Sequence, residues 1–369
     1  MYFLSTYRKM LNVLIDKEKL MKNIRIICNK VNKKHMIAVL KDNAYGHGID
    51  KIAEYLIEAG INLYAVGTID EAIKLRKLSE NIKILILKRV EDEELKVAIH
   101  NNISITIDSI EYLKKLLKYE KSTKEKITAH IKFDVGLHRW GIEYSEGIIK
   151  QIANMLRNSS ILIDGVFTQL RDTYFSLNDN KCEKVYMEIR KQCMEEIKGV
   201  KYFHFRTTPA VNSEIYKWEY LRVGAGLYGI PNNRKGILKQ LNRVMKISTT
   251  VKTVKKLKKG ETLGYTPSEF VANTNIKIAI IPTGYADGVE WDSCLYINNK
   301  KIEILAIFLD SMIVKIDETV KEGMKVEVDS YIGYRKNKAL SQITCHYGNI
   351  VTNRVIYLEE KDLVEYEEK

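Results

Sequence analysis

The chain has 369 residues, 45% of them hydrophobic, which is enough to bury the cores of two domains. Its net charge is +13, but the lysines are spread along the whole chain, which is typical of a solvated surface and argues against nucleic acid as a partner. Five scattered cysteines form no Cys-x-x-Cys pair, so we expect no metal site and a reduced, cytoplasmic protein. No segment approaches the roughly 18 apolar residues of a membrane span, so we expect neither a signal peptide nor an anchor.

Over the first two-thirds of the chain, short β-branched runs alternate with longer amphipathic stretches, a pattern typical of strands joined by crossover helices. Eight strands are predicted, at Met36–Leu40, Leu63–Gly67, Ile82–Leu87, Ile103–Ile107, Ile127–Phe133, Gly165–Gln169, Tyr202–Phe205 and Tyr220–Val223. Predicted helices include Ile69–Leu78, Ile110–Tyr119 and Cys182–Ile197. This α/β pattern indicates a (β/α)8 TIM-type barrel, whose active site would lie at the carboxyl ends of the strands.

After about Lys239 the pattern changes to strands without long helices. These strands are predicted at Val244–Val251, Ile276–Ile281, Leu295–Ile297, Lys301–Ala306, Met312–Ile316 and Lys325–Val328, with turn signals at Asn298-Asn299 and Asp287-Gly288. We therefore expect a barrel domain over residues 12–239 and a mainly-β C-terminal domain over 240–369, with residues 1–11 packed on the β domain.

Lys41 directly follows the first predicted strand, in the segment AVLKDNAYGHG that spans residues 38–48. The amine of a lysine at a barrel mouth can form an imine with a carbonyl compound. Taken alone, however, a lysine at a strand end is more often a surface residue whose ammonium reaches water.

Two further segments carry candidate chemistry. Glycines Gly224, Gly226 and Gly229 follow the eighth strand, and such a loop lets backbone N–H groups approach a phosphate, although it also suits a tight turn. Residues 130–141, HIKFDVGLHRWG, place several polar groups at the end of the fifth strand, where they would point into the barrel mouth or form a surface ion cluster.

Together with Leu263-Gly-Tyr265 and residues 281–288, IPTGYADG, these segments resemble the alanine racemase family, in the same order and at similar spacing. The resemblance covers nearly the whole chain. It is most specific in the Lys-x-x-Ala-Tyr-Gly-His-Gly motif that begins at Lys41 and in the Pro-x-Gly-Tyr-Ala-Asp-Gly motif that begins at Pro282.

The resemblance implies a pyridoxal 5'-phosphate enzyme of fold type III that forms homodimers with active sites shared between chains. By similarity, Lys41 holds the cofactor as an imine, and the phosphate is held by Tyr45, Thr208, Gly224 and Ala225. Arg222 would face the pyridine nitrogen, where its permanent charge disfavours protonation of that nitrogen and restrains side reactions.

The resemblance also implies a two-base mechanism, because racemisation removes a proton from one face of the α-carbon and returns one to the other. Lys41 would serve the D face and Tyr265 of the partner subunit the L face. Arg139 would bind the cofactor's ring hydroxyl and the substrate carboxylate, and Lys132 matches a lysine that is carbamylated in some members. The substrate-binding residues at the entrance, contributed by the partner subunit, would be Tyr285, Leu309 and Asp310.

Five positions depart from the family pattern. Gln169 replaces a histidine that links the tyrosine base to the pyridine arginine, and Gln cannot carry that positive charge. Thr207 and Thr208 replace an asparagine-serine pair, and Thr208 keeps a hydroxyl that can donate to phosphate. Leu309 replaces a methionine. Ser341 or Gln342 stands where the family has a tyrosine that closes the substrate pocket, so a more polar wall could admit serine.

Three functions remain open from the sequence. The first is racemisation of alanine, which would supply D-alanine for peptidoglycan. The second is the same chemistry with serine or a broader range of amino acids, and the third is a weakly active protein that binds the cofactor. Neither a membrane nor nucleic acid is expected as a partner.

Overall fold

The computed structural model describes residues 11–123, 125–170, 180–214, 216–230, 235–265, 270–287, 289, 291, 293–329 and 355–358. The chain divides into two compact units. The barrel unit consists of residues 19–45 and 49–242, and the sheet unit contains residues 11–18, 46–48 and the chain from residue 243 onward. Among the described residues, no helix is long and apolar enough to cross a membrane.

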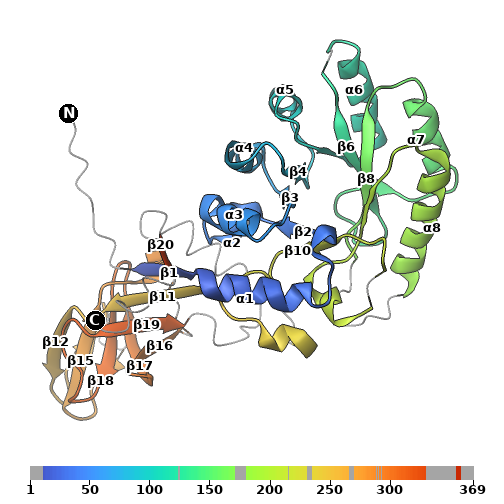
Figure 1. Cartoon of the computed structure of the whole chain (residues 1–369). Helices are drawn as coiled ribbons and strands as arrows, with labels where there is room; N and C mark the ends of the chain where they lie inside the picture. The colour runs from blue at the N-terminus through green and yellow to red at the C-terminus, as the bar shows by residue number, and fades with distance from the viewer. Residues whose placement is uncertain are drawn as a thin grey trace. The chain divides into compact units, whose positions relative to one another are not determined.

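The barrel unit is built on eight parallel strands among its described residues (Figure 1). One arc has the order β10-β2-β3-β4 and the other the order β5-β6-β8-β9. The strands are β2 (Met36–Val39), β3 (Leu63–Val66), β4 (Lys83–Ile86), β5 (Ile105–Ile107), β6 (Thr128–Asp134), β8 (Leu162–Phe167), β9 (Tyr202–His204) and β10 (Leu221–Val223). The short strand β7 (Ile142–Glu143) pairs with β6.

Parallel bridges close the two arcs into a barrel. Leu85 bridges to Ser104 between β4 and β5, and Phe203 bridges to Glu219 between β9 and β10. The predicted (β/α)8 barrel is therefore confirmed, and each predicted strand overlaps an observed one.

Helices lie outside the strands of this unit (Figure 1). They are α3 (Ile49–Glu58), α4 (Ile69–Leu78), α5 (Asp92–His100), α6 (Ile110–Glu120), α7 (Ile148–Leu156) and α8 (Asn180–Glu196), with α1 (Lys17–Cys28) before β2. Helix α4 shows why the sequence forms them: Thr68 and Glu71 make a capping box, and Ile69, Ala72 and Leu75 recur at helical spacing and are buried. The predicted helix at 69–78 has the observed bounds.

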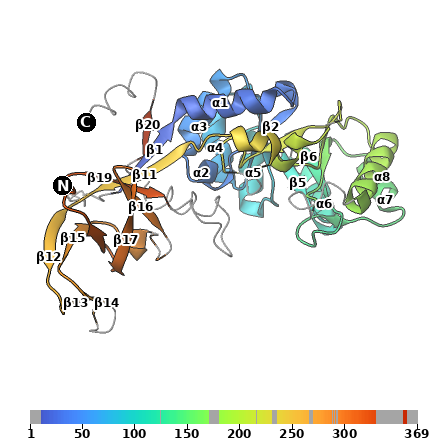
Figure 2. The same cartoon turned by 90° about the horizontal axis from the view of Figure 1, so that it is seen from below.

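The sheet unit is mainly β, as predicted (Figure 2). Nine strands follow the order β12-β15-β18-β17-β16-β19-β11-β1-β20, and β13 pairs with β14. Their bounds are β1 (Asn12–Asp16), β11 (Met245–Thr250), β12 (Thr253–Leu257), β13 (Thr262–Leu263), β14 (Phe270–Val271), β15 (Ile276–Ile281), β16 (Cys294–Ile297), β17 (Lys300–Ile307), β18 (Met312–Ile316), β19 (Lys325–Asp329) and β20 (Val355–Leu358).

Strand β1 lies in this sheet, between β11 and β20, although the expected barrel domain began at residue 12. Its three apolar residues Val13, Leu14 and Ile15 are all buried. Such a short, continuous apolar run has no periodicity that would assign it to one sheet or the other. The pairing is decided by contacts distant in sequence, and residues 1–10 lie outside the described residues.

The turn signal at Asn298-Asn299 is confirmed. These two residues join β16 to β17, and their φ angles are 50° and 62°. Positive φ at both central positions is the geometry of a tight two-residue hairpin, and asparagine tolerates it better than most residues. The other predicted turn, at Asp287-Gly288, is described only in part, since Gly288 lies outside the described residues.

Replacing Asn299 with valine should destabilise the sheet unit, because a β-branched residue is strained at positive φ. We expect the free energy of unfolding to fall by about 1–2 kcal/mol. Urea unfolding followed by fluorescence measures this, with Asn299→Gly as the control that keeps full stability. Equal losses in both variants would contradict the role assigned to the turn.

Candidate active site

A cavity of about 410 Å³ lies at the carboxyl ends of the barrel strands, a size that suits a small ligand. Every barrel residue to which the family resemblance assigned a site role lines it: Lys41, Tyr45, Lys132, Arg139, Thr208, Arg222, Gly224 and Ala225. Gln169 and Thr207, two positions that depart from the family pattern, also line it. Residues from distant parts of the sequence thus converge on one site.

Lys41 stands at the start of a left-handed turn. The short segment α2 (Lys41–Tyr45) follows β2, and Asp42, Asn43, Ala44 and Tyr45 all have φ near 54°. Four successive non-glycine residues in this conformation destabilise the folded state, because the left-handed conformation costs about 1–2 kcal/mol for each of them. The turn must therefore be held by other contacts.

Glu71 provides one of these contacts. Its Oε1 accepts a hydrogen bond of 2.9 Å from the Asn43 N–H, and its Oε2 accepts one of 2.8 Å from the Gly67 N–H. The Asn43 Oδ1 in turn accepts from the Ile49 N–H at 2.9 Å. These bonds tie the turn to the end of β3 and aim Lys41, whose side chain is 39% exposed, at the cavity.

A glycine is required where Tyr45 meets the loop after β10. A Cβ atom on Gly224 would lie 2.5 Å from the Tyr45 hydroxyl, which is closer than atoms can approach. The next glycine, Gly226, packs against Thr208 in the same way and donates its N–H to the Thr208 hydroxyl at 3.2 Å. A tyrosine hydroxyl, a threonine hydroxyl and close-packed backbone thus gather on one side of the cavity.

Arg222 is buried under the cavity and carries several hydrogen bonds. It donates to the carbonyls of His204 (2.8 Å) and Thr168 (2.7 Å), to His204 Nδ1 at 2.9 Å, and to Gln169 Oε1 at 3.1 Å. Burial lowers the pKa of Arg222 to about 10, which still leaves it charged at neutral pH. The Gln169 amide therefore turns its oxygen to the arginine, because a guanidinium can only donate.

Lys132 lies among positive charges. It is only 6% exposed, and its Nζ lies 5.4 Å from the centre of the Phe167 ring. Burial and the charges of Arg222 and Arg139 lower the pKa of Lys132 to about 8. A large share of its amine is therefore neutral, and nucleophilic, slightly above neutral pH.

Asp134 organises the loop that carries Arg139. Its Oδ1 accepts hydrogen bonds from the backbone N–H groups of Gly136, Leu137 and His138, and its Oδ2 accepts from the Arg139 N–H at 3.1 Å. Burial alone would raise the pKa of Asp134, but the bonds from Gly136, His138 and Arg139 outweigh it, so the pKa lies below its usual value. The carboxylate fixes the backbone from which Arg139 extends.

The other predicted site residues, Tyr265, Tyr285, Leu309 and Asp310, belong to the sheet unit. Two of them contact Phe308, the residue before Leu309: the Tyr265 ring packs edge-on against the Phe308 ring with centroids 5.3 Å apart, and the Tyr285 N–H donates to the Phe308 carbonyl. Tyr265, Tyr285 and Leu309 are 84%, 59% and 56% exposed. Ser341 and Gln342 lie outside the described residues.

Sequence reasoning missed the parts played by Glu71, Asp134 and His204. A signal existed for the first two. Glu71 stands three residues after Thr68, the spacing of a capping box, and Asp134 precedes Gly136 by two, the spacing of an Asx turn. The position of His204 beside Arg222 depends on barrel closure, for which no local pattern exists.

Comparison with protein families gives two matches. The model of the alanine racemase N-terminal domain matches residues 15–232, and the model of the alanine racemase C-terminal domain matches residues 244–360. The alanine racemase of Borreliella burgdorferi is 32% identical over 335 residues, which cover 86% of this chain and 88% of that protein. Alanine racemase 1 of Bacillus subtilis is 28% identical over 354 residues, covering 90% and 88%.

Solved structures share the fold. The alanine racemase of Clostridium difficile 630 superposes with a TM-score of 0.84 at 24% identity, covering 96% of this chain and 97% of that one. The histidine racemase of Leuconostoc mesenteroides has a TM-score of 0.79 at 20% identity, covering 96% and 98%. The same fold thus occurs in proteins named for different amino acids.

Replacing Asp134 with alanine leaves four backbone N–H groups without their acceptor, so we expect the free energy of unfolding at pH 7 to fall by about 2 kcal/mol. Because its pKa is lowered by folding, the carboxylate stabilises the fold above about pH 4, and this stabilisation is lost as the pH falls through the folded pKa. Urea unfolding at pH 7 and in acid measures both effects. A difference from wild type that does not shrink in acid would contradict the assignment, and Asp134→Asn, which keeps one acceptor, should lose less.

Proposed function

The chain belongs to the alanine racemase family, and we propose that it is a pyridoxal-phosphate-dependent enzyme that interconverts L- and D-alanine. The observation that carries the proposal is the convergence of Lys41, Tyr45, Arg222 and Gly224 on one cavity at the barrel mouth. We infer that the D-alanine produced serves peptidoglycan synthesis.

The residues of the cavity fit the cofactor. Lys41 offers an amine for its aldehyde, while Tyr45, Thr208 and the backbone of Gly224 and Ala225 line the wall that suits its phosphate. The lack of a side chain at Gly224, enforced by the Tyr45 hydroxyl, keeps that wall close-packed. When bound, pyridoxal phosphate withdraws electrons from an attached amino acid and so acidifies its α-hydrogen.

Arg222 would meet the pyridine nitrogen of the cofactor. Its guanidinium donates hydrogen bonds and stays charged at neutral pH, so it would keep that nitrogen unprotonated. Gln169 supports this orientation through its bond to Nη2 and adds no charge of its own. Arg139, on the loop fixed by Asp134, is proposed to bind the substrate carboxylate as a charged hydrogen-bond donor.

Two groups are proposed to move the α-proton. Lys41 would accept or return it on the D face of the substrate, and Tyr265 of the partner subunit on the L face. Support for a second copy comes from the sheet unit, where Tyr265, Tyr285 and Leu309 expose large side chains around Phe308. We propose that this exposed group, with Asp310, completes the active site of another chain in a homodimer.

Mixing two inactive variants tests the shared site. Lys41→Ala and Tyr265→Phe should each abolish racemisation. Random exchange of subunits gives about half mixed dimers, each with one intact site, so the mixture should recover about a quarter of wild-type activity. Recovery of no activity, although mixed dimers are detected by mass spectrometry, would show that both residues act within one chain.

Lys132 is proposed to be carbamylated, since its neutral amine can attack CO₂ and the anion formed would lie beside Arg222 and Arg139. The nitrogen forms a bond to the carbon and releases a proton to solvent. With ¹³C-labelled CO₂ held at fixed concentration, we expect a carbamate ¹³C signal that grows as the pH rises through about 8, where half of the amine is neutral. Its persistence in Lys132→Arg would contradict the assignment.

Hydrogen exchange at the α-carbon separates the possible substrates. In deuterated water, ¹H NMR should show rapid loss of the α-hydrogen from both enantiomers of alanine, at least about tenfold slower loss from serine, and none with Lys41→Ala. Faster exchange of serine would establish a serine racemase. Cofactor binding without exchange of either amino acid would indicate a cofactor-binding protein with little activity.

A further inference from the structure

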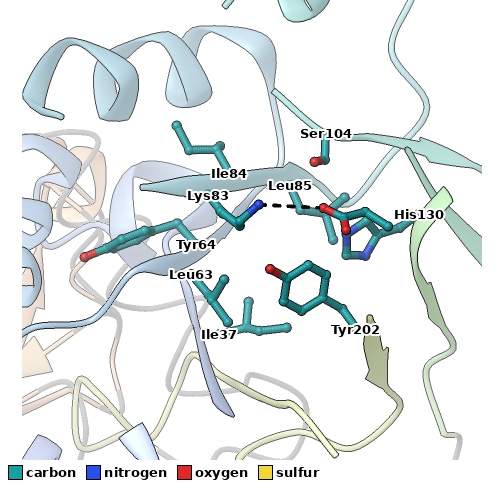
Figure 3. A pocket seen from close by; sticks show the side chains of 10 residues that line it. Ile37, Leu63, Tyr64, Lys83, Ile84, Leu85, Ser104, His130 and Tyr202 are labelled. Carbon is teal, nitrogen blue, oxygen red and sulfur yellow. Dashed lines mark ion pairs between the residues drawn. The ribbon is translucent and has the colours of Figure 1, made fainter. Parts of the chain in front are cut away.

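A second cavity, of about 30 Å³, lies inside the barrel at the amino ends of the strands (Figure 3). Its walls include the first residues of three strands, Leu63, Lys83 and Tyr202, together with His130 and Asp164. Figure 3 shows the side chains of Lys83, His130 and Tyr202 gathered around it. The volume is about that of one water molecule.

The Asp164 carboxylate is the group in this cavity that most needs a partner. The residue is 4% exposed, and its Oδ1 accepts no hydrogen bond from any described residue. The other oxygen, Oδ2, lies 3.9 Å from Lys83 Nζ, too far for a hydrogen bond. A buried, charged oxygen without a donor is expensive, so the cavity beside it calls for one.

A bulge in β8 puts Asp164 in this position. The register of β8 with β6 passes from Ile163 opposite Ala129 directly to Gly165 opposite His130, so Asp164 is the extra residue. Gly165 has no side chain because a Cβ atom there would lie 2.3 Å from His130 Nδ1. The bulge therefore accounts for the position of the Asp164 carboxylate and, through Gly165, leaves space for the imidazole that shares the cavity.

The hydrogen bond from Arg222 determines which ring nitrogen carries the hydrogen in two buried histidines, His204 and His130. Because a guanidinium only donates, His204 Nδ1 must accept, which leaves the hydrogen of the neutral ring on Nε2. His204 Nε2 lies 3.0 Å from His130 Nδ1, so it donates there and His130 carries its own hydrogen on Nε2. Burial and the charge of Lys83 lower the pKa of His130 to about 3, and burial and Arg222 lower that of His204 well below its usual value, so both rings are neutral.

The series of hydrogen bonds from Arg222 through His204 to His130 thus ends at the small cavity. His130 lines the cavity, and since its Nδ1 is occupied by His204, the Nε2–H is the polar group that it can offer there. Stacking holds the two rings in this orientation: His130 packs on Tyr202 and His204 on Phe167, each with an interplanar angle of 9°. What the cavity lacks is a link between a donor, His130, and an acceptor, Asp164.

We propose that the cavity binds one water molecule, which accepts from His130 Nε2–H and donates to the Asp164 carboxylate, and that Asp164 is thereby a positioning residue for Arg222. The water completes an ordered chain from the carboxylate at one end of the barrel to the guanidinium at the other. If the ring hydrogen of either imidazole lay on Nδ1 instead of Nε2, that N–H would face another donor, so the fixed tautomers keep Arg222 aimed at the active-site cavity. The part that concerns Arg222 and catalysis rests on the proposed function.

Neutron diffraction from crystals of the full-length protein with pyridoxal phosphate tests the chain directly, because it locates hydrogen. We expect deuterium on Nε2 of both His130 and His204, and a water within hydrogen-bond distance of His130 Nε2 and an oxygen of the Asp164 carboxylate. Deuterium on Nδ1 of either ring, or a dry cavity, would overturn the proposal.

Kinetics test the consequence for Arg222. Asp164→Leu keeps the size of the side chain but removes the acceptor, and should lower kcat for alanine on the order of tenfold with little change in KM. Asp164→Asn keeps an acceptor and should stay within about twofold of wild type. Lys83→Met should do the same, because it removes the ion pair and the contact of the ammonium with the Tyr202 ring but leaves the carboxylate in place. Equal losses in Asp164→Leu and Lys83→Met would contradict a positioning role.

The two tests distinguish a failure of the proposed function from a failure of the proposed water site. An enzyme that exchanges no amino-acid hydrogen would contradict the proposed function, while the neutron map would still decide on the water and the two tautomers. If Asp164→Leu does not fold, the map of the wild-type protein decides alone.

Discussion

The pairing of β10 with β2, the last and first strands of the barrel, is the constraint on which the site depends. In this parallel ladder Val223 lies opposite Ala38, so the loop that begins at Gly224 starts beside the turn that begins at Lys41. Almost two hundred residues separate these segments in the sequence. Without closure, the lysine and the glycine loop would each be an ordinary strand end, and the contact between Tyr45 and Gly224 would not exist.

Closure also creates the buried polar interior that supports Arg222. The arginine extends from β10, His204 from β9 and His130 from β6. Both ring nitrogens of His204 and Nδ1 of His130 have a partner that fits their donor or acceptor role. Burying a guanidinium is expensive unless its donors are satisfied, and here carbonyls, an imidazole and an amide share that task. The same hydrogen bonds that offset the cost of burying the guanidinium also fix its orientation.

Much of the fold could be predicted from the sequence because its signals are local. Short runs of four to seven residues indicated the barrel strands, and the helix Ile69–Leu78 was predicted to the residue. The capping box of Thr68 and Glu71 is a further local signal that marks its start. The barrel residues of the site could be predicted from motifs, and they line one cavity. The placement of β1 in the sheet unit could not, because the short run Asn12–Asp16 suits either sheet equally well.

The left-handed turn after Lys41 also escaped prediction, since Asp42 to Tyr45 have no glycine to announce it and are held by the distant Glu71. The central claim is that Lys41 is the residue to which pyridoxal phosphate attaches. Borohydride reduction of the protein with its cofactor, followed by peptide mass mapping, tests this most directly. The account predicts that the reduced cofactor is found on the peptide containing Lys41, and attachment to any other lysine would contradict it.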